Sequence, residues 1–314
     1  SWIDGSGLWS DATHWSSNPN FPGAADDVVI TDNIAGPTAT ITHNTGTDTI
    51  RSINNSETVV VNGGSTLSIL LTVGSTNTGT LQAGGASAGT IALGTGAALN
   101  NFNGTLRADN GGLITLSNTT IQNGTLATSG SGIIRTVSGT TNALYGSTNL
   151  TLSAGTQFNV QSNSTLNLLG TITNNGTIGL APSVSETYLV LGASSVVVSG
   201  TGEIVLGAGD NGIRSRISSS NPNYVLVNDT GHTIRGAGYV GLSNLILTNR
   251  GTITADNSSY SLIINPSGTS TNTGTLQATG GASLQLLNRT YTNTGGTILA
   301  TGAGSTVFLV GATI

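Results

Sequence analysis

The sequence predicts an all-β chain folded as a right-handed parallel β-helix (β-solenoid), with roughly a dozen coils of about 20–26 residues. Three observations predict this class: a short phrase recurs, apolar and polar residues alternate within it, and no helical periodicity accompanies it. The phrase is an Asn or a small polar residue followed by Gly-Thr-(Leu/Ile). Its threonines, at steps of 25, 20, 52, 75, 23 and 22 residues, are Thr80, Thr105, Thr125, Thr177, Thr252, Thr275 and Thr297.

Each phrase has the alternation of a strand with one buried face. In the segment 275–278, Leu276 and Ala278 are expected to point inward and Thr275 outward, and the preceding glycine permits a bend between sheets. The outward threonines are expected to form a row along one face. A flat array of threonines could bind ice, but the array would need Thr at the next outward position too, and other residues interrupt that position. The β-propensity of Thr therefore explains the row better than ice binding does. The inward residues expected to stack between coils are Leu81, Leu106, Leu126, Ile178, Ile253, Leu276 and Ile298.

The Asn before each glycine is expected to accept a turn conformation and to hydrogen-bond the Asn one coil above or below. Further strands of each coil are predicted in apolar runs elsewhere in the chain. With about 23 residues per coil, the chain from about residue 35 onward supplies the dozen coils, and the usual crossover preference predicts the right hand. The additional strands are predicted at residues 58–62, 188–191, 195–198, 224–227 and 260–264.

Composition narrows the possible functions. The 314 residues carry a net charge of -5, all 8 basic residues are Arg, and Lys, Cys and Met are absent. No basic cluster exists to bind phosphates, so we expect no nucleic-acid partner. No 18-residue apolar run exists, so we expect no membrane span. The chain begins without an initiator Met, which fits an exported protein after signal-peptide removal and fits a trimmed chain equally well. The localisation that we expect is the extracellular space or the cell surface.

Residues 1–33 lack the repeat and are predicted to form an N-terminal cap on the repeat region 34–314. The end of a solenoid exposes an apolar core and an open strand edge, which an aromatic plug can cover. The alternative is that the tryptophan faces stack on sugar rings. The residues that the cap hypothesis singles out are Trp2, Trp9, Trp15 and Phe21.

The other end of the chain is an apolar, strand-like run. Its residues Val307, Phe308, Leu309 and Ile314 are predicted as a subunit contact that meets the Trp-rich start of another copy. Contacts of this head-to-tail kind that do not close into a ring produce filaments. Truncation of a longer solenoid explains the same run, and both interpretations stay open.

Chemistry-bearing residues are few. The densest charged patch holds Asp210, Arg214 and Arg216, and Arg235 follows about one coil later. If these residues stack on one face, they could bind an acidic glycan. A row of surface salt bridges explains the same residues. Three separated histidines without cysteines give no metal-ligand spacing. We therefore predict no catalytic, cofactor-binding or metal-binding residues and no enzyme activity; a polysaccharide lyase or glycoside hydrolase is the alternative.

Two segments carry a resemblance to a known family. Residues 2–15 read Trp-x-x-Gly-x-Gly-x-Trp-Ser-Asp-x-x-x-Trp, and residues 22–30 read Pro-Gly-Ala-Ala-Asp-Asp-Val-Val-Ile. Together with the Asn-x-Gly-Thr-Ile-x-Ala phrases and residues 228–238, they resemble exported bacterial β-solenoid proteins of the filamentous-haemagglutinin and autotransporter-passenger type. The resemblance implies display at the cell surface in adhesion, matrix or filament roles.

The predicted function is therefore an extracellular structural or adhesive β-solenoid, and head-to-tail polymerisation into filaments of a surface or matrix layer is one of the two open interpretations of its apolar end. The alternative is a polysaccharide-binding module, or a glycan lyase or hydrolase, that uses the charged face of the β-helix. Self-association and surface glycans are the expected partners, with no cofactor. Fold by itself does not decide between these functions.

Overall fold

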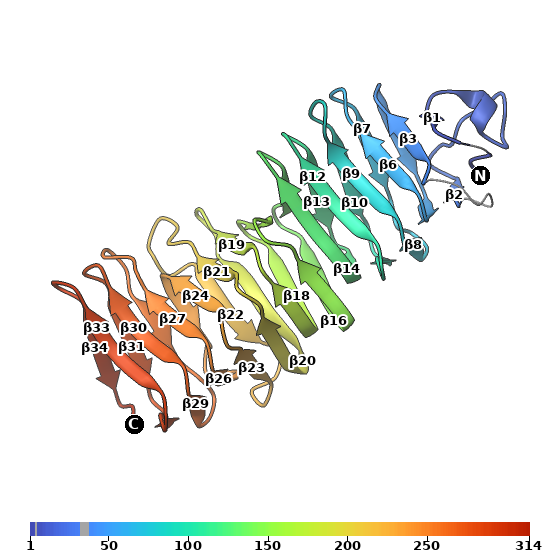
Figure 1. Cartoon of the computed structure of the whole chain (residues 1–314). Coiled ribbons are helices and arrows are strands. Elements are labelled where there is room, and N and C mark those ends of the chain that lie inside the picture. Colours follow the sequence, from blue (N-terminus) through green and yellow to red (C-terminus); the bar gives the residue numbers. More distant parts are fainter. Residues whose placement is uncertain (4, 32–37) are drawn as a thin grey trace. The chain divides into compact units, whose positions relative to one another are not determined.

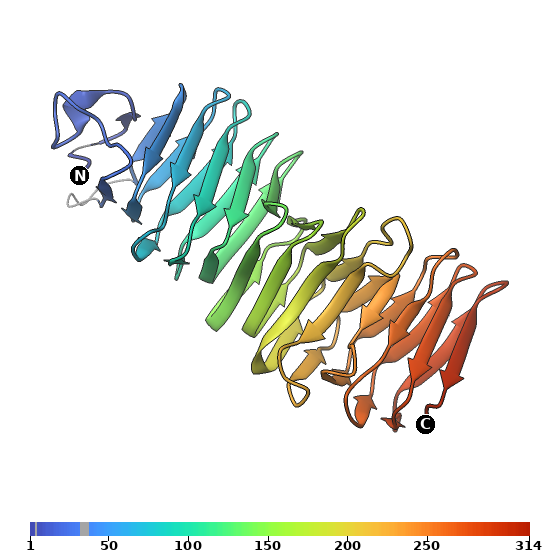
Figure 2. The same cartoon turned by 180° about the vertical axis from the view of Figure 1, so that it is seen from behind.

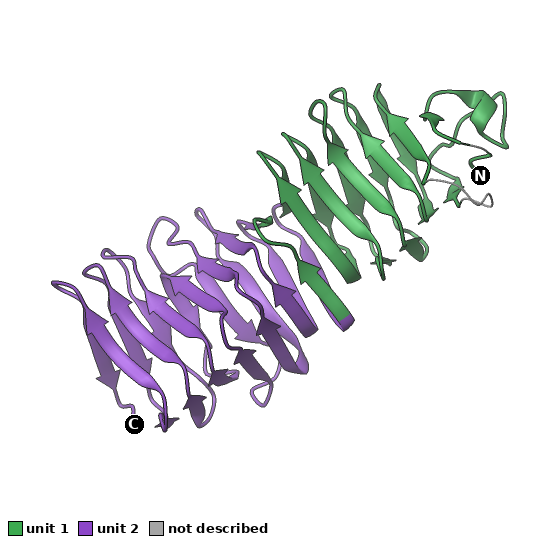
Figure 3. Ribbon diagram, viewed as in Figure 1, with its two compact units in different colours: residues 1–137, 149–157 green, residues 138–148, 158–314 purple. Residues whose placement is uncertain are grey.

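The computed structural model describes residues 1–3, 5–31 and 38–314 and is a parallel β-solenoid of about 12 turns, as the repeat predicts. The boundary predicted between residues 33 and 34 lies outside the described residues. Contacts divide the chain into two compact units (Figure 3). Unit 1 is Ser1–Val137 with Asn149–Gln157, and unit 2 is Ser138–Thr148 with Phe158–Ile314.

In unit 1 each coil adds a strand to each of three parallel ladders, which are named first, second and third in chain order (Figure 1). The first ladder holds β2 (Asp27–Ile30), β5 (Ser52–Asn55), β8 (Ser75–Asn77), β11 (Ala98–Asn100) and the start of β14 (Thr120–Ser129). The second holds β1 (Gly7–Leu8), β3 (Thr40–His43), β6 (Thr58–Val61), β9 (Thr80–Gly84), β12 (Thr105–Asp109) and the end of β14. The third holds β4 (Thr47–Ile50), β7 (Thr66–Ile69), β10 (Thr90–Gly94), β13 (Leu113–Ser117) and β15 (Ile133–Thr136).

Unit 2 repeats the three ladders, and Figure 2 shows its strands from behind. The first ladder holds the starts of β18 (Thr165–Asn174) and β20 (Thr187–Ser199), then β22 (Ser215–Ser219), β25 (Gly238–Val240), β28 (Leu262–Ile264), β31 (Ser283–Leu287) and β34 (Thr306–Val310). The second holds the ends of β18 and β20, then β23 (Val225–Asn228), β26 (Ile246–Asn249), β29 (Ser270–Asn272) and β32 (Tyr291–Thr292). The third holds β19 (Thr177–Ala181), β21 (Glu203–Leu206), β24 (Thr233–Gly236), β27 (Thr252–Ala255), β30 (Thr275–Thr279) and β33 (Thr297–Thr301).

The remaining elements are few. β16 (Thr141–Leu152) and β17 (Gln157–Gln161) lie where the chain passes between the two units, and the 3-10 helix η1 (Ala12–His14) lies near the N-terminus. No helix among the described residues has the length and apolar character that a membrane crossing requires.

Apolar stacking between coils fills the interior of each unit. Leu276 of β30 and Ile253 of β27 are partners in the third ladder and are fully buried, while Thr275 and Thr252 beside them are partly exposed. The predicted inward residues follow this pattern, except that Ile298 in the last coil is half-buried. The alternation therefore predicted the buried face correctly.

The phrase threonines do not form one row, which corrects the sequence prediction. In unit 1, Thr80, Thr105 and Thr125 are partners in the second ladder. In unit 2, Thr252 and Thr275 are partners in the third ladder. The phrase fits either corner of the coil, because it specifies a turn followed by a strand and contains nothing that selects the sheet.

The predicted asparagine ladder is present in both units. In unit 2, the Asn249 amide donates to Asn272 Oδ1 at 2.7 Å, and Asn228 donates in turn to Asn249 at 2.7 Å. In unit 1, Asn55 donates to Asn77 at 2.8 Å. These side chains are buried and also donate to turn carbonyls, so each ladder satisfies backbone groups that water cannot reach.

His232 extends the unit 2 ladder. Its Nδ1 lies 2.7 Å from Asn228 Oδ1, and its Nε2 lies 3.0 Å from Asn174 Nδ2. Asn174 Oδ1 already accepts from the Gly176 amide, and Asn174 Nδ2 also donates to the Glu203 carbonyl oxygen. Nε2 must therefore accept and Nδ1 must donate, which makes His232 a neutral member of the ladder. Burial lowers its pKa to about 4.

The three tryptophans form one buried cluster in unit 1. Trp15 packs edge-on against both Trp2 and Trp9, each with ring centroids 4.9 Å apart. Their exposed fractions are 8% for Trp2, 1% for Trp9 and 0% for Trp15, so no indole face is open to a sugar ring. Phe21, which the cap hypothesis grouped with them, is 47% exposed and lies outside the cluster.

Candidate functional site

A polar hollow of about 310 Å³ opens on the first-ladder side of unit 2. This volume lies at the lower end of the range of small-molecule sites, which are concave and carry a few convergent polar groups. Strands β18 and β20 supply its floor, and the loops at residues 182–186 and 207–214 supply its rim. The lining residues are Asn163, Thr165, Val184, Ser185, Glu186, Tyr188 and Arg214.

Strand pairing sets the floor of the hollow. Thr165, Tyr188, Arg216 and Tyr239 are successive partners in the first ladder, and their partly exposed side chains alternate with buried neighbours. The Arg216 guanidinium carbon lies 5.9 Å from the Tyr188 ring centroid and 5.7 Å from that of Tyr239. These are cation–π contacts, so the Arg216 guanidinium covers one face of the Tyr188 ring. The next partner on the opposite side is the small Thr165, and both residues line the hollow.

Two carboxylates and two guanidinium groups surround this floor. Glu186 Oε1 accepts a hydrogen bond from Arg216 Nη2 at 2.6 Å, and Glu186 Oε2 accepts one from the Tyr188 hydroxyl at 3.2 Å. Arg214 pairs with both carboxylate oxygens of Asp210. That pairing lowers the pKa of Asp210 and raises that of Arg214, whereas burial raises the pKa of Tyr188. The two carboxylates and the two guanidinium groups carry opposite charges, so the net charge of the site is zero.

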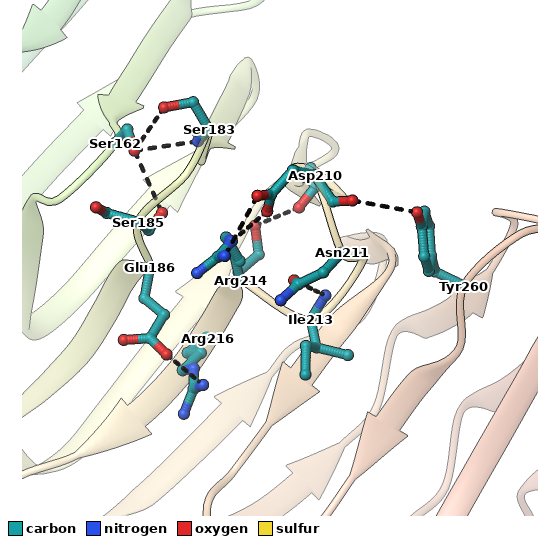
Figure 4. A network of polar contacts seen from close by, with 12 residues as sticks. Ser162, Ser183, Ser185, Glu186, Asp210, Asn211, Ile213, Arg214, Arg216 and Tyr260 are labelled. Atoms are coloured by element: carbon teal, nitrogen blue, oxygen red, sulfur yellow. Dashed lines mark hydrogen bonds and ion pairs between the residues drawn. The ribbon is translucent and has the colours of Figure 1, made fainter.

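The rim loop at residues 182–186 is fixed by hydrogen bonds that Figure 4 shows. The Ser183 backbone amide donates to Ser162 Oγ at 3.0 Å, and the Ser162 hydroxyl donates to the Ser185 carbonyl oxygen at 3.2 Å. The Thr187 amide donates to the carbonyl oxygen of Arg214 at 2.9 Å, which ties this segment to the other loop. Glu186 thus projects from a segment anchored on both sides.

The rim loop at residues 207–214 rests on Tyr260 from a later coil (Figure 4). The Tyr260 hydroxyl donates to the Asp210 carbonyl oxygen at 3.4 Å. Gly212 has a φ of +75°, and a Cβ atom added there would lie 1.9 Å from Cγ of the Tyr260 ring. Only glycine fits this close approach.

We therefore expect Gly212→Ala to displace the loop and to misplace Arg214 without unfolding the solenoid. The added methyl group cannot coexist with the Tyr260 ring, and the positive φ adds strain. Nuclear magnetic resonance should show shifted signals for residues 207–214 and 260 and unchanged signals for the third ladder. Gly280→Ala, also at positive φ but with open space around it, serves as the control. Unchanged signals for residues 207–214 in Gly212→Ala would contradict the inference that close contact with Tyr260 holds this loop in place.

The sequence hypothesis of one charged face is wrong. Arg235 lies in β24 of the third ladder, where Val205 and Thr254 are its strand partners, whereas Arg216 lies in the first ladder. Arg235 pairs with Glu203 at 2.6 Å and with Asp256 at 3.1 Å. These pairings raise the pKa of Arg235. Asp210, Arg214 and Arg216 do gather at the hollow, and Arg235 belongs to a separate ion-pair row.

The residues predicted as an end contact lie in or just after β34. Val307 is half-buried, and Phe308, Leu309 and Ile314 are exposed. Their exposure follows from their place in the last coil of the described chain. Within the described residues, no group of three or more His, Cys, Asp or Glu side chains gathers in a way that could hold a metal ion.

Sequence reasoning predicted Arg214 at the site but missed the other six lining residues, which are Asn163, Thr165, Val184, Ser185, Glu186 and Tyr188. Tyr188 was recognised as the start of a strand, but its contact with Arg216 depends on which residues pair across coils. The alternation of residues 187–191 was the available signal that Tyr188 points outward.

Fold and site together define a parallel β-solenoid with a polar hollow on its lateral surface. No protein-family model matches the chain, and neither the curated proteins nor the solved structures contain a significant match.

Proposed function

We propose that this chain is an extracellular adhesive β-solenoid, of the type that the sequence resembles, and that it binds carbohydrate in the hollow of unit 2. The observation that carries the proposal is the arrangement of Tyr188 between Arg216 on one side and a polar hollow on the other. An aromatic face beside charged hydrogen-bonding groups suits a sugar ring, since its C–H face packs on the aromatic ring and its hydroxyls pair with planar polar groups.

The rest of the architecture suits a passive scaffold. Buried apolar stacks and asparagine ladders fill the interior, while the charged side chains at the hollow are paired with one another. A glycoside hydrolase requires an acid whose pKa is raised. Pairing with Arg214 instead lowers the pKa of Asp210, so Asp210 does not suit the role of that acid.

We expect Tyr188→Ala to weaken polysaccharide binding at least about tenfold, because it removes the aromatic face and the hydroxyl bond that orients Glu186. Affinity electrophoresis against a panel of soluble polysaccharides measures the effect. Tyr224→Ala is the matched control, since Tyr224 is a half-buried tyrosine of unit 2 that lies just before β23 in the second ladder.

Circular dichroism must show that both variants keep the fold of the unchanged protein. Equal losses of binding in Tyr188→Ala and Tyr224→Ala, or no loss in either, would place binding elsewhere and overturn the proposal.

A further inference from the structure

We infer that the hollow selects a neutral, hydroxyl-rich sugar residue rather than an acidic one. This inference rests on the proposed function and names the class of its ligand. It replaces the acidic glycan that the sequence offered as an alternative ligand, because the structure pairs Arg214 with Asp210 and Arg216 with Glu186.

The first argument is charge balance. Arg214 and Arg216, the two arginines at the hollow, are each paired with a carboxylate of the same unit, Asp210 and Glu186 respectively. A uronate or sulfated sugar would have to displace a carboxylate that already has good geometry, or approach Glu186 as a like charge. Both routes cost free energy, because removing one partner of an ion pair leaves the other unpaired.

The second argument is the set of hydrogen-bonding groups that remains. Arg214 uses Nε and Nη2 on Asp210, and a guanidinium group has five N–H donors, so Arg214 retains donors at the hollow. Each Glu186 oxygen accepts one hydrogen bond from the protein and has a further lone pair. The Asn163 side chain adds an amide to the lining. This mixture of donors and acceptors matches hydroxyl groups, which both donate and accept.

The third argument is shape. Thr165 occupies the ladder position next to Tyr188, one strand spacing of about 4.8 Å away. A small side chain at that position leaves the Tyr188 ring facing the hollow instead of facing another bulky neighbour. The hollow of about 310 Å³ accommodates one or two sugar rings. A pyranose ring stacked on Tyr188 would direct its hydroxyls toward Glu186 and Arg214 on the rim.

The decisive experiment compares Glu186→Gln with the unchanged protein on two kinds of probe. The neutral probes are a mannan, a galactan and a β-glucan, and the acidic probes are polygalacturonate and alginate. The unchanged protein should bind a neutral probe with an affinity that stays constant between about 0.05 and about 0.5 M NaCl, since no net charge pairs across the interface. The affinity of Glu186→Gln for the neutral probe should be about tenfold lower than that of the unchanged protein. The variant should also gain salt-sensitive binding to an acidic probe, because the positive charge of the arginines is then no longer balanced.

The control is Glu203→Gln, the same change at a carboxylate paired with Arg235 in the third ladder. Glu203→Gln should bind the neutral and the acidic probes with the same affinities as the unchanged protein. Salt-sensitive binding of an acidic probe by the unchanged protein, lost in Tyr188→Ala, would overturn the inference about neutral sugars and leave the proposed function standing. Failure of every probe to bind in a manner that depends on Tyr188 would overturn both.

Discussion

Replacement of Asn249 by alanine is expected to lower the free energy of unfolding by about 3 kcal/mol, because buried polar groups on both sides of it lose their partners. Asn249 is fully buried; it accepts from Asn228 and donates to Asn272, each at 2.7 Å. Its amide also reaches the carbonyl oxygens of Gly251 and Thr275 at 3.2 Å. Alanine leaves all of these groups in an interior that water cannot enter.

Urea denaturation followed by circular dichroism measures this loss. Asn223→Ala is the matched control, because Asn223 lies exposed in a turn of the same unit, and we expect a change below about 0.5 kcal/mol there. Similar small effects in both variants would show that the ladder contributes little to stability and that apolar stacking alone holds the coils.

The second large effect is a loss of stability in acid that originates at His232. Burial holds the pKa of His232 at about 4 in the folded chain, against 6.5 for an ordinary histidine. As the pH falls below 6.5, His232 becomes protonated in the unfolded chain but stays neutral in the folded chain. The free energy of unfolding therefore declines until about pH 4. Below that pH His232 is protonated in both states and causes no further loss of stability. The difference corresponds to about 3 kcal/mol.

Neighbouring groups reinforce the neutral form. Protonated Nε2 would place an N–H against the amide of Asn174, whose orientation is fixed by the Gly176 amide and the Glu203 carbonyl oxygen. The negative charge of Glu203 opposes this by raising the pKa of His232, and burial outweighs it.

His232→Gln provides the test. A glutamine amide can donate to Asn228 and accept from Asn174 as neutral imidazole does, but it does not titrate. The free energy of unfolding, measured by urea denaturation at pH 7, 5.5 and 4, should therefore fall less in the variant than in the unchanged protein. Parallel pH dependences in the two proteins would contradict the assignment of a neutral, buried His232.

Local patterns predicted several features correctly. Alternation of Leu276 with Thr275 and Gln277 defined a strand and its buried side, and the recurring Asn-Gly corner predicted the hydrogen bond from Asn249 to Asn272. These features depend on a few consecutive residues and on repetition of the same residue in every coil. Such information is fully present in a sequence.

Other features required distances between coils. His232 was interpreted as an isolated histidine, yet it bridges Asn174 and Asn228 because the intervening coil lacks a ladder asparagine. Arg235 was placed with Arg216 from their proximity in sequence, whereas they lie in different ladders. Sequence distance does not measure distance around a coil.

The sequence by itself determined the class of fold, the inward residues and the asparagine ladder, because each follows from a short pattern that repeats. Only the tertiary structure decided which side chains meet across coils. The step from Tyr188 to its strand partner Arg216 is 28 residues, whereas the next step, from Arg216 to Tyr239, is 23 residues. The longer coil contains the loop at residues 207–214, and no regular period predicts such an insertion. The hollow beside Tyr188 therefore arises from an irregularity in the repeat, which becomes visible only when the coils are stacked.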